Sequence, residues 1–207
     1  MNKIIPLFPL KIVVYPNSSV PLHIFEERYK TMINLCLKND SGFGIVSLIR
    51  NKISSVGCYV KITKIIKKYP GGESDIIVTG IQRFSIKSKV KKKIGYLEAE
   101  ISEIKDEKAS VDVKLLYSVE NKFNELVTKT QFKLEDNFWQ NLEKTDIKSF
   151  KIAEKSGLNL NQQQKLLEIQ NENQRLILLI DHFNKLNKSL TENMKLRSII
   201  LGDGYIN

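Results

Sequence analysis

The chain has 207 residues, of which 42% are hydrophobic, so it is long enough and apolar enough to bury a core. No apolar run approaches the roughly 18 residues that a membrane-spanning helix needs, and prolines interrupt the start of the chain where a secretion signal needs a continuous apolar segment. The net charge of +10 lies in residues 1–105, because residues 106–207 contain equal numbers of basic and acidic side chains. This asymmetry predicts two differently built halves, and we expect a cytoplasmic protein that does not enter a membrane.

Prolines punctuate the first part of the chain, at Pro6, Pro9, Pro16 and Pro21. Each proline fixes φ near about −65° and lacks the backbone N–H that a helix or a strand ladder uses. The segment is therefore predicted to form short extended pieces, and neither a helix nor a central, fully paired strand. The residues between the prolines are mostly apolar, Phe8 and Leu10 among them, so we expect these pieces to be pinned into a core.

After the last of these prolines the apolar spacing becomes helical. Apolar side chains recur at positions that share one helix face, namely Phe25, Tyr29, Met32, Ile33 and Cys36. Glu26 and Glu27 would lie in the first turn, where the helix dipole favours carboxylates, and residues 39–42 end the pattern. We expect an amphipathic helix from about Phe25 to Lys38 that buries this face.

Residues 43–101 carry the patterns of short strands. Strands are predicted at residues 43–49, 56–66, 75–79, 84–90 and 95–101. Gly71 and Gly72 supply a hairpin turn, and Gly80 is predicted to mark a bulge or a close approach of two backbones. Six or seven strands, counted with the extended pieces before the helix, predict a closed or pseudo-barrel sheet, because closure removes exposed strand edges.

Beyond a polar segment at residues 105–109 the periodicity is helical. Ser110 is expected to cap one helix, Gly157 to end another, and Asn161 with Gln164 to form a capping box before a third. The last helix, from about Glu172, carries an apolar stripe at Leu176, Leu179, Ile180, Phe183, Leu186 and Leu190. No helix is apolar on every side, so a bundle of four or five is predicted. The predicted fold class is therefore α+β, with a β domain at residues 1–105 and a helical bundle at residues 106–207.

Several of these segments together resemble one family. Residues 6–10 read P-L-F-P-L, residues 21–29 read P-L-H-I-F-E-E-R-Y and residues 43–46 read F-G-I-V, a series similar to the amino-terminal substrate-binding domain of Lon proteases. Gly80, Arg83 and Phe84 match the G-x-x-R-F of that family, and residues 149–154 and 161–168 are similar to segments of its helical half. Tyr15 and Asn17 stand where Phe and Gly are usual. The resemblance implies a PUA-like β barrel followed by helices.

No cluster of residues predicts catalysis. Full Lon proteases carry ATPase and peptidase modules, but this sequence has no G-x-x-x-x-G-K-[ST] phosphate loop, and its length leaves no room for a peptidase module. His23 has no serine or cysteine nucleophile placed beside it and is interpreted as a structural histidine at a helix start. Cys36 and Cys58 lack metal-site spacing and are expected to be buried, reduced side chains. We therefore expect a non-enzyme without metal or cofactor.

The resemblance implies recognition of unfolded or partner polypeptides, with an accessory role in proteolysis or protein quality control and with a protease as one expected partner. An extended peptide could add to an open edge of the sheet, or apolar side chains could enter a groove between the two halves; the sequence favours neither route. His23, Glu26, Arg28 and Arg83 are the candidate partner-binding residues, since they are polar members of the matched motifs. The alternative interpretation is that these residues are architectural. The oligomeric state and the bound protein stay open.

Lysines provide the alternative hypothesis, which is binding of RNA or another nucleic acid. They are concentrated in two predicted strand regions, as Lys61, Lys64, Lys67 and Lys68 and as Lys87, Lys89, Lys91, Lys92 and Lys93. Such a basic surface attracts phosphates. These clusters lack interleaved aromatic residues that would stack on bases, with Tyr69 the nearest, so the sequence favours polypeptide over nucleic acid.

Overall fold

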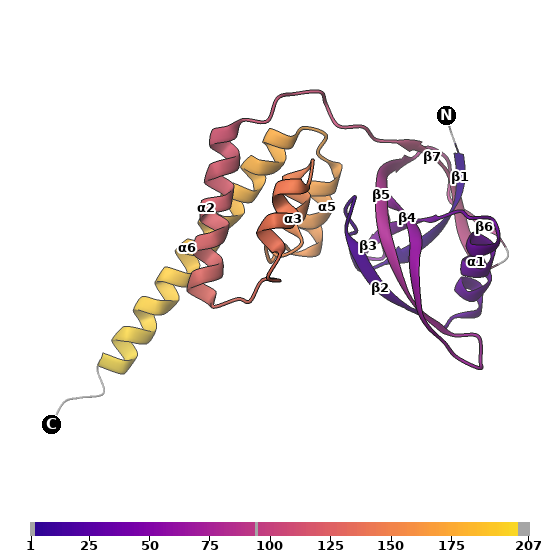
Figure 1. Cartoon of the computed structure of the whole chain (residues 1–207), viewed down its shortest axis with the longest axis horizontal. Helices are drawn as coiled ribbons and strands as arrows, with labels where there is room; N and C mark the ends of the chain where they lie inside the picture. The colour runs from indigo at the N-terminus through magenta and orange to yellow at the C-terminus, as the bar shows by residue number, and fades with distance from the viewer. Residues whose placement is uncertain (1–2, 94, 203–207) are drawn as a thin grey trace. The chain divides into compact units, whose positions relative to one another are not determined.

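The structure is a computed structural model that describes residues 3–93 and 95–202, with side chains as far as residue 192 (Figure 1). The chain forms two compact units, which we call the β unit and the helical unit. The β unit contains Met1–Glu107 together with Asn159–Gln170, and the helical unit contains Lys108–Leu158 together with Asn171–Asn207. The first boundary falls within the polar segment at residues 105–109. The predicted helical domain at residues 106–207 differs from this division, because residues 159–170 belong to the β unit.

Five strands of the β unit close into a barrel of mixed pairing. They are β1 (Lys3–Leu10), β3 (Phe43–Ile49), β4 (Lys52–Lys68), β5 (Ser74–Ile86) and β7 (Tyr96–Glu103). Strand β1 pairs parallel to β3 and antiparallel to β7, and the pairing of β5 with β7 closes the ring. Strand β2 (Ser19–Ile24) adds to β5, and the short β6 (Lys91–Lys93) adds to β7. This closed barrel confirms the predicted closure of the sheet.

The first proline-containing piece forms strand β1 inside this sheet. The prolines were predicted to exclude a central, fully paired strand, and β1 is central but not fully paired. Residues 3–7 of β1 pair with β7, whereas residues 7–10 pair with β3, so the two ladders share only Leu7. Each half of β1 therefore pairs along one edge only, so one side of each half needs no ladder donor, and a proline, which has no N–H, is tolerated there. As predicted, β1 is not fully paired, although it lies between two other strands.

Helix α1 (Glu27–Lys38) packs against the barrel with four of its five predicted apolar residues. Tyr29, Met32, Ile33 and Cys36 are buried, and the ring of Tyr29 stacks on Phe8 with centroids 3.9 Å apart. The prediction was wrong for Phe25, which precedes the helix and is 61% exposed. The helix begins only after the extended N-cap Glu26, so Phe25 is not part of the helix face.

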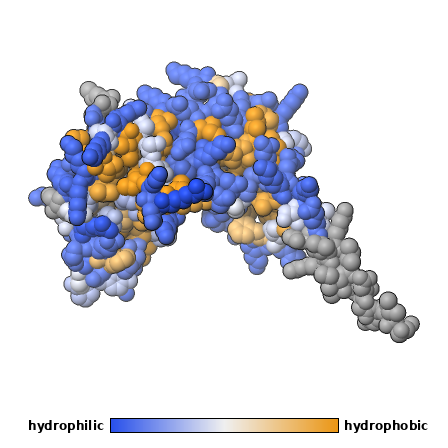
Figure 2. Space-filling view, turned by 180° about the vertical axis from the view of Figure 1, so that it is seen from behind, coloured by the Kyte–Doolittle hydropathy of each residue, from blue (hydrophilic) through white to orange (hydrophobic). Residues whose placement is uncertain are grey.

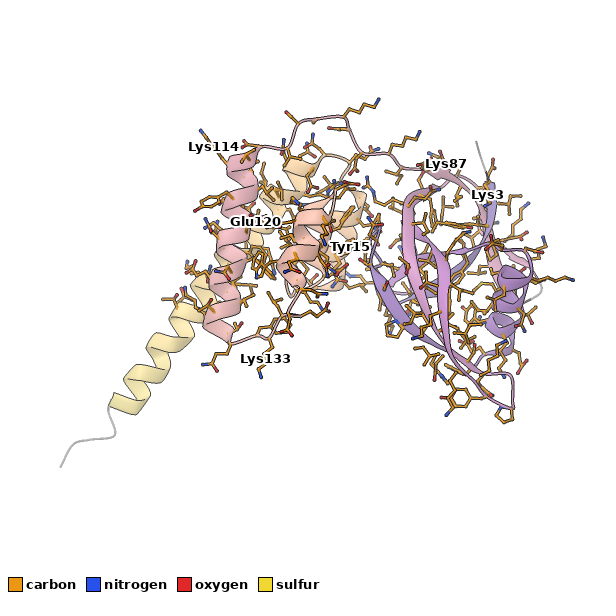
Figure 3. All side chains as sticks on the ribbon, in the orientation of Figure 1. Lys3, Tyr15, Lys87, Lys114, Glu120 and Lys133 are labelled. Atoms are coloured by element: carbon orange, nitrogen blue, oxygen red, sulfur yellow. The ribbon has the colours of Figure 1, made fainter. Side chains whose placement is uncertain are left out.

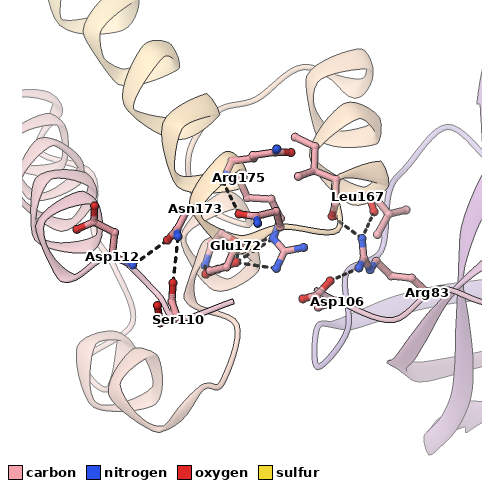
Figure 4. A network of polar contacts seen from close by, with 12 residues as sticks. Arg83, Asp106, Ser110, Asp112, Leu167, Glu172, Asn173 and Arg175 are labelled. Carbon is pink, nitrogen blue, oxygen red and sulfur yellow. Dashed lines mark hydrogen bonds and ion pairs between the residues drawn. The ribbon is translucent and has the colours of Figure 1, made fainter. Parts of the chain in front are cut away.

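The helical unit consists of α2 (Val113–Thr130), α3 (Phe138–Lys144), α4 (Lys148–Ala153) and α6 (Glu172–Gly202). The ring of Phe123 in α2 lies 5.6 Å from Phe138 and 5.7 Å from Phe183, measured between centroids. Arg175 is fully buried and donates to Glu172 and to the hydroxyl of Ser149 (Figure 4). These contacts join α4 and α6 around an aromatic core. No helix of the described residues combines the length and the apolarity that crossing a membrane would require.

Two predicted helix caps were wrong by two residues. Asp112, and not Ser110, accepts from the N–H groups at the start of α2, whereas the Ser110 carbonyl accepts from Asn173. Asn159 with Gln162 forms the capping box of α5 (Leu160–Glu168), and the predicted partner Gln164 is buried instead. Several Ser, Asp and Asn residues precede each helix, so the sequence alone does not identify which of them caps it.

Gly80 lies where β5 passes the backbone of Tyr15, which confirms the predicted close approach. A Cβ atom at Gly80 would lie 2.1 Å from the carbonyl oxygen of Tyr15. The same glycine accepts from the N–H of Asn17 at 2.8 Å and donates to the carbonyl of Ser18 at 2.9 Å. No side chain fits at this position without moving the strand.

We predict that Gly80→Ala lowers the free energy of unfolding by about 2–3 kcal/mol, because the added methyl group meets backbone that cannot yield. Gly71→Ala is the matched control, since the atoms nearest to its added Cβ would be those of the Glu73 carboxylate, at the end of a flexible side chain, and we expect a change within about 0.5 kcal/mol. Urea unfolding of both variants measures the difference. Equal stability of the two variants would contradict this account of Gly80.

Candidate functional site

Three of the four candidate residues lie on the surface where β2 leads into α1. His23 is near the end of β2, and its Nδ1 lies 2.6 Å from Oδ1 of Asp75 in β5. The hydroxyl of Tyr69 donates to Oδ2 of the same carboxylate at 2.7 Å. The hydrogen bond with His23, and then that from Tyr69, lower the pKa of Asp75. His23 therefore has a structural partner, while its side chain stays 53% exposed.

Glu26 and Arg28 pair with each other beside this cluster. Their side chains are 2.6 Å apart, and the guanidinium of Arg28 lies over the ring of Tyr29 at 4.6 Å from its centroid. Both side chains are more than 40% exposed, so the pair contributes little to stability. Glu26 is the N-cap residue of α1, but its side chain accepts no hydrogen bond from the helix. Both side chains therefore remain accessible from outside.

Lys30 fastens the first turn of α1 to the β4–β5 turn. Its Nζ donates to Glu27 at 2.9 Å, to the carbonyl of Gly71 at 2.8 Å and to Glu73 at 3.2 Å. The hydrogen bonds to Glu27 and to Glu73 raise the pKa of Lys30. This contact fixes the base of the hairpin turn against α1 and so positions the surface that His23 shares with Tyr69.

Arg83 is not on that surface, because the structure buries it with 3% exposure. Its guanidinium donates to the carbonyls of Leu167 and Ile169 at 2.7 and 2.6 Å and forms an ion pair with Asp106 (Figure 4). The two carbonyls lie at the C-terminal end of α5, where helix carbonyls lack partners of their own. Arg83 thus anchors α5 to the barrel. The sequence motif gave no sign of this, since the three partners lie 23 to 86 residues away.

Further contacts of the same kind hold α5 within the β unit. Gln164 donates to the carbonyl of Val56 at 3.1 Å, and the hydroxyl of Tyr15 donates to the carbonyl of Gln163 at 3.4 Å. Tyr15 is labelled among the side chains in Figure 3. These bonds explain why residues 159–170 pack with the barrel although they are surrounded by helical sequence.

The two cysteines and His23 have structural surroundings. Cys36 and Cys58 are buried as expected, and burial raises the pKa of Cys58 to about 12, so this thiol is not a nucleophile at neutral pH. No group of three potential metal ligands occurs in the described part of the chain. The contacts of His23 are to Asp75, Phe25 and Tyr69, which supports the structural interpretation of this histidine.

The helical unit contains an apolar pocket that sequence reasoning missed. Its volume is about 490 Å³, and its apolar lining includes Phe123, Leu126, Val127, Phe132, Phe183 and Leu186. Phe132, which follows α2, is 49% exposed. Part of the predicted apolar stripe of α6, Phe183 and Leu186, lines this pocket, although Phe183 is also buried against Phe123. Figure 2 shows other hydrophobic residues at the surface among hydrophilic ones.

The predicted basic surface is present but divided. Lys64, Lys67 and Lys68 are exposed on β4, whereas Lys91, Lys92 and Lys93 are exposed on β6 at the far side of β7 in the strand order. Lys87, which follows β5, is also exposed (Figure 3). The two groups of lysines therefore lie on strands that are not neighbours in the sheet.

We predict that Arg83→Met destabilises the β unit by about 3–5 kcal/mol, because it leaves Asp106 and the α5 carbonyls without their buried donor. The matched control Arg28→Met removes a guanidinium that is 46% exposed, and we expect it to cost at most about 1 kcal/mol. Urea unfolding followed by far-UV circular dichroism compares the two. If Arg83→Met were as stable as Arg28→Met, the anchoring role of Arg83 would be wrong.

Comparison with known proteins identifies a family and several relatives with similar sequence or fold. Residues 4–185 match the family described as the ATP-dependent protease La (LON) substrate-binding domain. The Lon protease of Buchnera aphidicola subsp. Acyrthosiphon pisum (strain APS) is 26% identical over 192 residues, which are 85% of this chain and 24% of that protein. The chain thus spans about a quarter of this relative's length.

Two solved structures share the fold. The Lon N-terminal domain protein from Xanthomonas campestris superposes with a TM-score of 0.68 at 22% identity, covering 86% of this chain and 98% of that one. The N-terminal domain of Mycobacterium avium complex Lon protease gives 0.64 at 21% identity, with 88% and 98% covered. The family match spans most of the chain, and the fold agrees with it. This chain belongs to the Lon substrate-binding domain family.

Proposed function

We propose that this chain is a non-catalytic polypeptide-binding domain that takes up apolar segments of unfolded or partner proteins. Membership of a substrate-binding family supports the general role. The pocket of the helical unit carries the specific proposal, because it offers about 490 Å³ of space lined by aromatic and aliphatic side chains. Clefts of this size and lining are typical of sites that bury apolar groups.

The pocket suits side chains of a client better than it suits a charged ligand. Leu126 and Phe183 line it from two helices, and Phe132 borders it while half exposed. An apolar side chain that enters loses contact with water on several sides at once, which is the main source of affinity in such recognition. Binding of this kind needs no ATP and no bond cleavage.

We also propose a setting for this activity. The domain would present clients in the cytoplasm, on behalf of a protease or of protein quality control. Exposed His23, Glu26 and Arg28 would make secondary polar contacts, whereas Arg83 would act only by holding α5. We further propose that the barrel is of the PUA-like type and that α2, α3, α4 and α6 form a small bundle. The Lon relatives lend no support to the nucleic-acid alternative.

The direct test measures binding of a fluorescently labelled, reduced and carboxymethylated protein that stays unfolded, by fluorescence anisotropy. We predict that Phe132→Ser weakens binding about tenfold, as expected when about 1.4 kcal/mol of apolar contact is lost. Tyr117→Ser is the matched control, because Tyr117 is 66% exposed on α2 and does not line the pocket. The control variant should bind like the natural chain.

Binding at high salt and assays for hydrolysis give the results that would contradict the proposed function. Apolar binding should persist at roughly 0.5 M salt, where interactions between exposed charges are largely screened. Loss of binding in this salt, or equal binding by Phe132→Ser and the natural chain, would refute the pocket proposal. Hydrolysis of ATP or of peptides by the purified chain would refute the non-catalytic part.

A further inference from the structure

The outer edge of β4 is open over its second half. Strand β4 pairs with β3 only as far as Val60, and with β5 on its other side, and these are its only strand partners in the described sheet. Residues 61–68 therefore continue beyond β3 with no strand outside them. Residues 63–68 are all exposed. This edge presents backbone N–H and C=O groups that can pair with another extended chain.

Two register shifts place three lysines on one face of this edge. Lys61, Lys64 and Lys67 are three residues apart, a spacing that would alternate faces in a regular strand. Shifts between Ile62 and Lys64 and between Ile65 and Lys67 each add one residue. The three lysines consequently pair with Thr79, Ile77 and Asp75, which alternate by two and share one face. We call Lys61, Lys64 and Lys67 the lysine row.

The opposite face of residues 61–68 is directed toward the core. Ile62 and Ile65 pair with Val78 and Ile76, both of which are buried in the core cluster that includes α1. Ile62 packs against this cluster, whereas Ile65 is 37% exposed at the open end. The edge is thus basic on its outer face and apolar on its inner face.

The positive charge of the lysine row is only partly balanced. Lys61 lies 3.5 Å from the fully exposed carboxylate of Asp40, and Lys67 lies over the ring of Tyr69 near Asp75. Within the described residues, no carboxylate forms an ion pair with Lys64. Such a row repels the same edge of a second copy and attracts carboxylates.

We infer that this edge binds an extended polypeptide segment in which acidic residues alternate with apolar ones. An added strand would place every second side chain beside the lysine row, at the spacing of about 6.6 Å that two strand residues span. The intervening side chains would face the side of Ile62 and Ile65. This inference rests on the proposed function and specifies the class of polypeptide, with charge complementarity as the selecting contact.

A nucleic acid would be attracted by the same charges but would not need the strand edge. The nearest aromatic ring, that of Tyr69, donates its hydroxyl to Asp75 and is covered by Lys67, so it offers no open stacking face on that side. Phosphates also carry no alternating apolar side chains for the inner face. The order of residues in a peptide therefore separates the two occupants experimentally.

The test uses labelled peptides of equal composition and anisotropy measurements on the full chain. In one peptide glutamate and valine alternate; in the second the same residues form two blocks; the third is the alternating peptide with every backbone nitrogen methylated. We predict that the alternating peptide binds at least about tenfold more tightly than either of the others, because only it pairs with the edge and meets the lysine row.

Variants assign the binding to this edge. Lys64→Gln/Lys67→Gln should weaken binding of the alternating peptide about tenfold, as expected for two lost charge-assisted contacts. Lys91→Gln/Lys92→Gln is the matched control, since it removes two exposed lysines from β6, and should leave binding unchanged. Far-UV circular dichroism checks that both variants are folded.

Three results would overturn the inference: equal binding of the alternating and blocked peptides, binding that survives backbone methylation, or single-stranded RNA of equal charge binding as tightly as the alternating peptide. The proposed function is tested separately, by the binding of the labelled unfolded protein to the natural chain and to Phe132→Ser at high salt. If that binding persists while the alternating peptide fails, only the edge proposal is wrong. If the unfolded probe fails as well, the proposed function is wrong.

Discussion

The two-sided pairing of β5 is the constraint on which the β unit depends. One side of β5 pairs with β4 along most of its length, while the other side pairs with β2 at its start and with β7 at its end. Between these two pairings, Gly80 allows β5 to pass close to the Tyr15 backbone. The same strand carries Asp75, which holds His23, and Arg83, which holds α5. Strand β5 therefore takes part in closing the barrel, in positioning His23 and in holding α5.

Much of the β unit could be predicted because its signals are local. The buried face of α1 and the close backbone approach at Gly80 follow from spacing and from a single residue type, and both are present. Phe25 was assigned to the wrong environment, because the position of a helix start depends on which residue caps it. Arg83 was named only as a candidate binding residue, because its buried partners come from a distant segment that the sequence does not place beside it.

The lysine row and the pocket show why the proposed binding surfaces are harder to predict than the fold. A spacing of three residues gives one shared face only when register shifts intervene, and those shifts appear only when β4 is aligned with β5. The pocket arises where helices with apolar stripes leave space that their own side chains do not fill. Both features come from how elements pack, whereas the family motif reports chiefly on the barrel and α1.

We propose that this chain binds polypeptide through the pocket and the β4 edge and performs no bond cleavage. Hydrogen–deuterium exchange on the full chain, with and without an excess of unfolded protein, tests it most directly. The account predicts added protection around residues 123–132 and 183–190, which contribute to the pocket, and at residues 61–68, with the unfolded protein recovered intact. Unchanged exchange in all these segments, or recovery of cleaved protein, would contradict it.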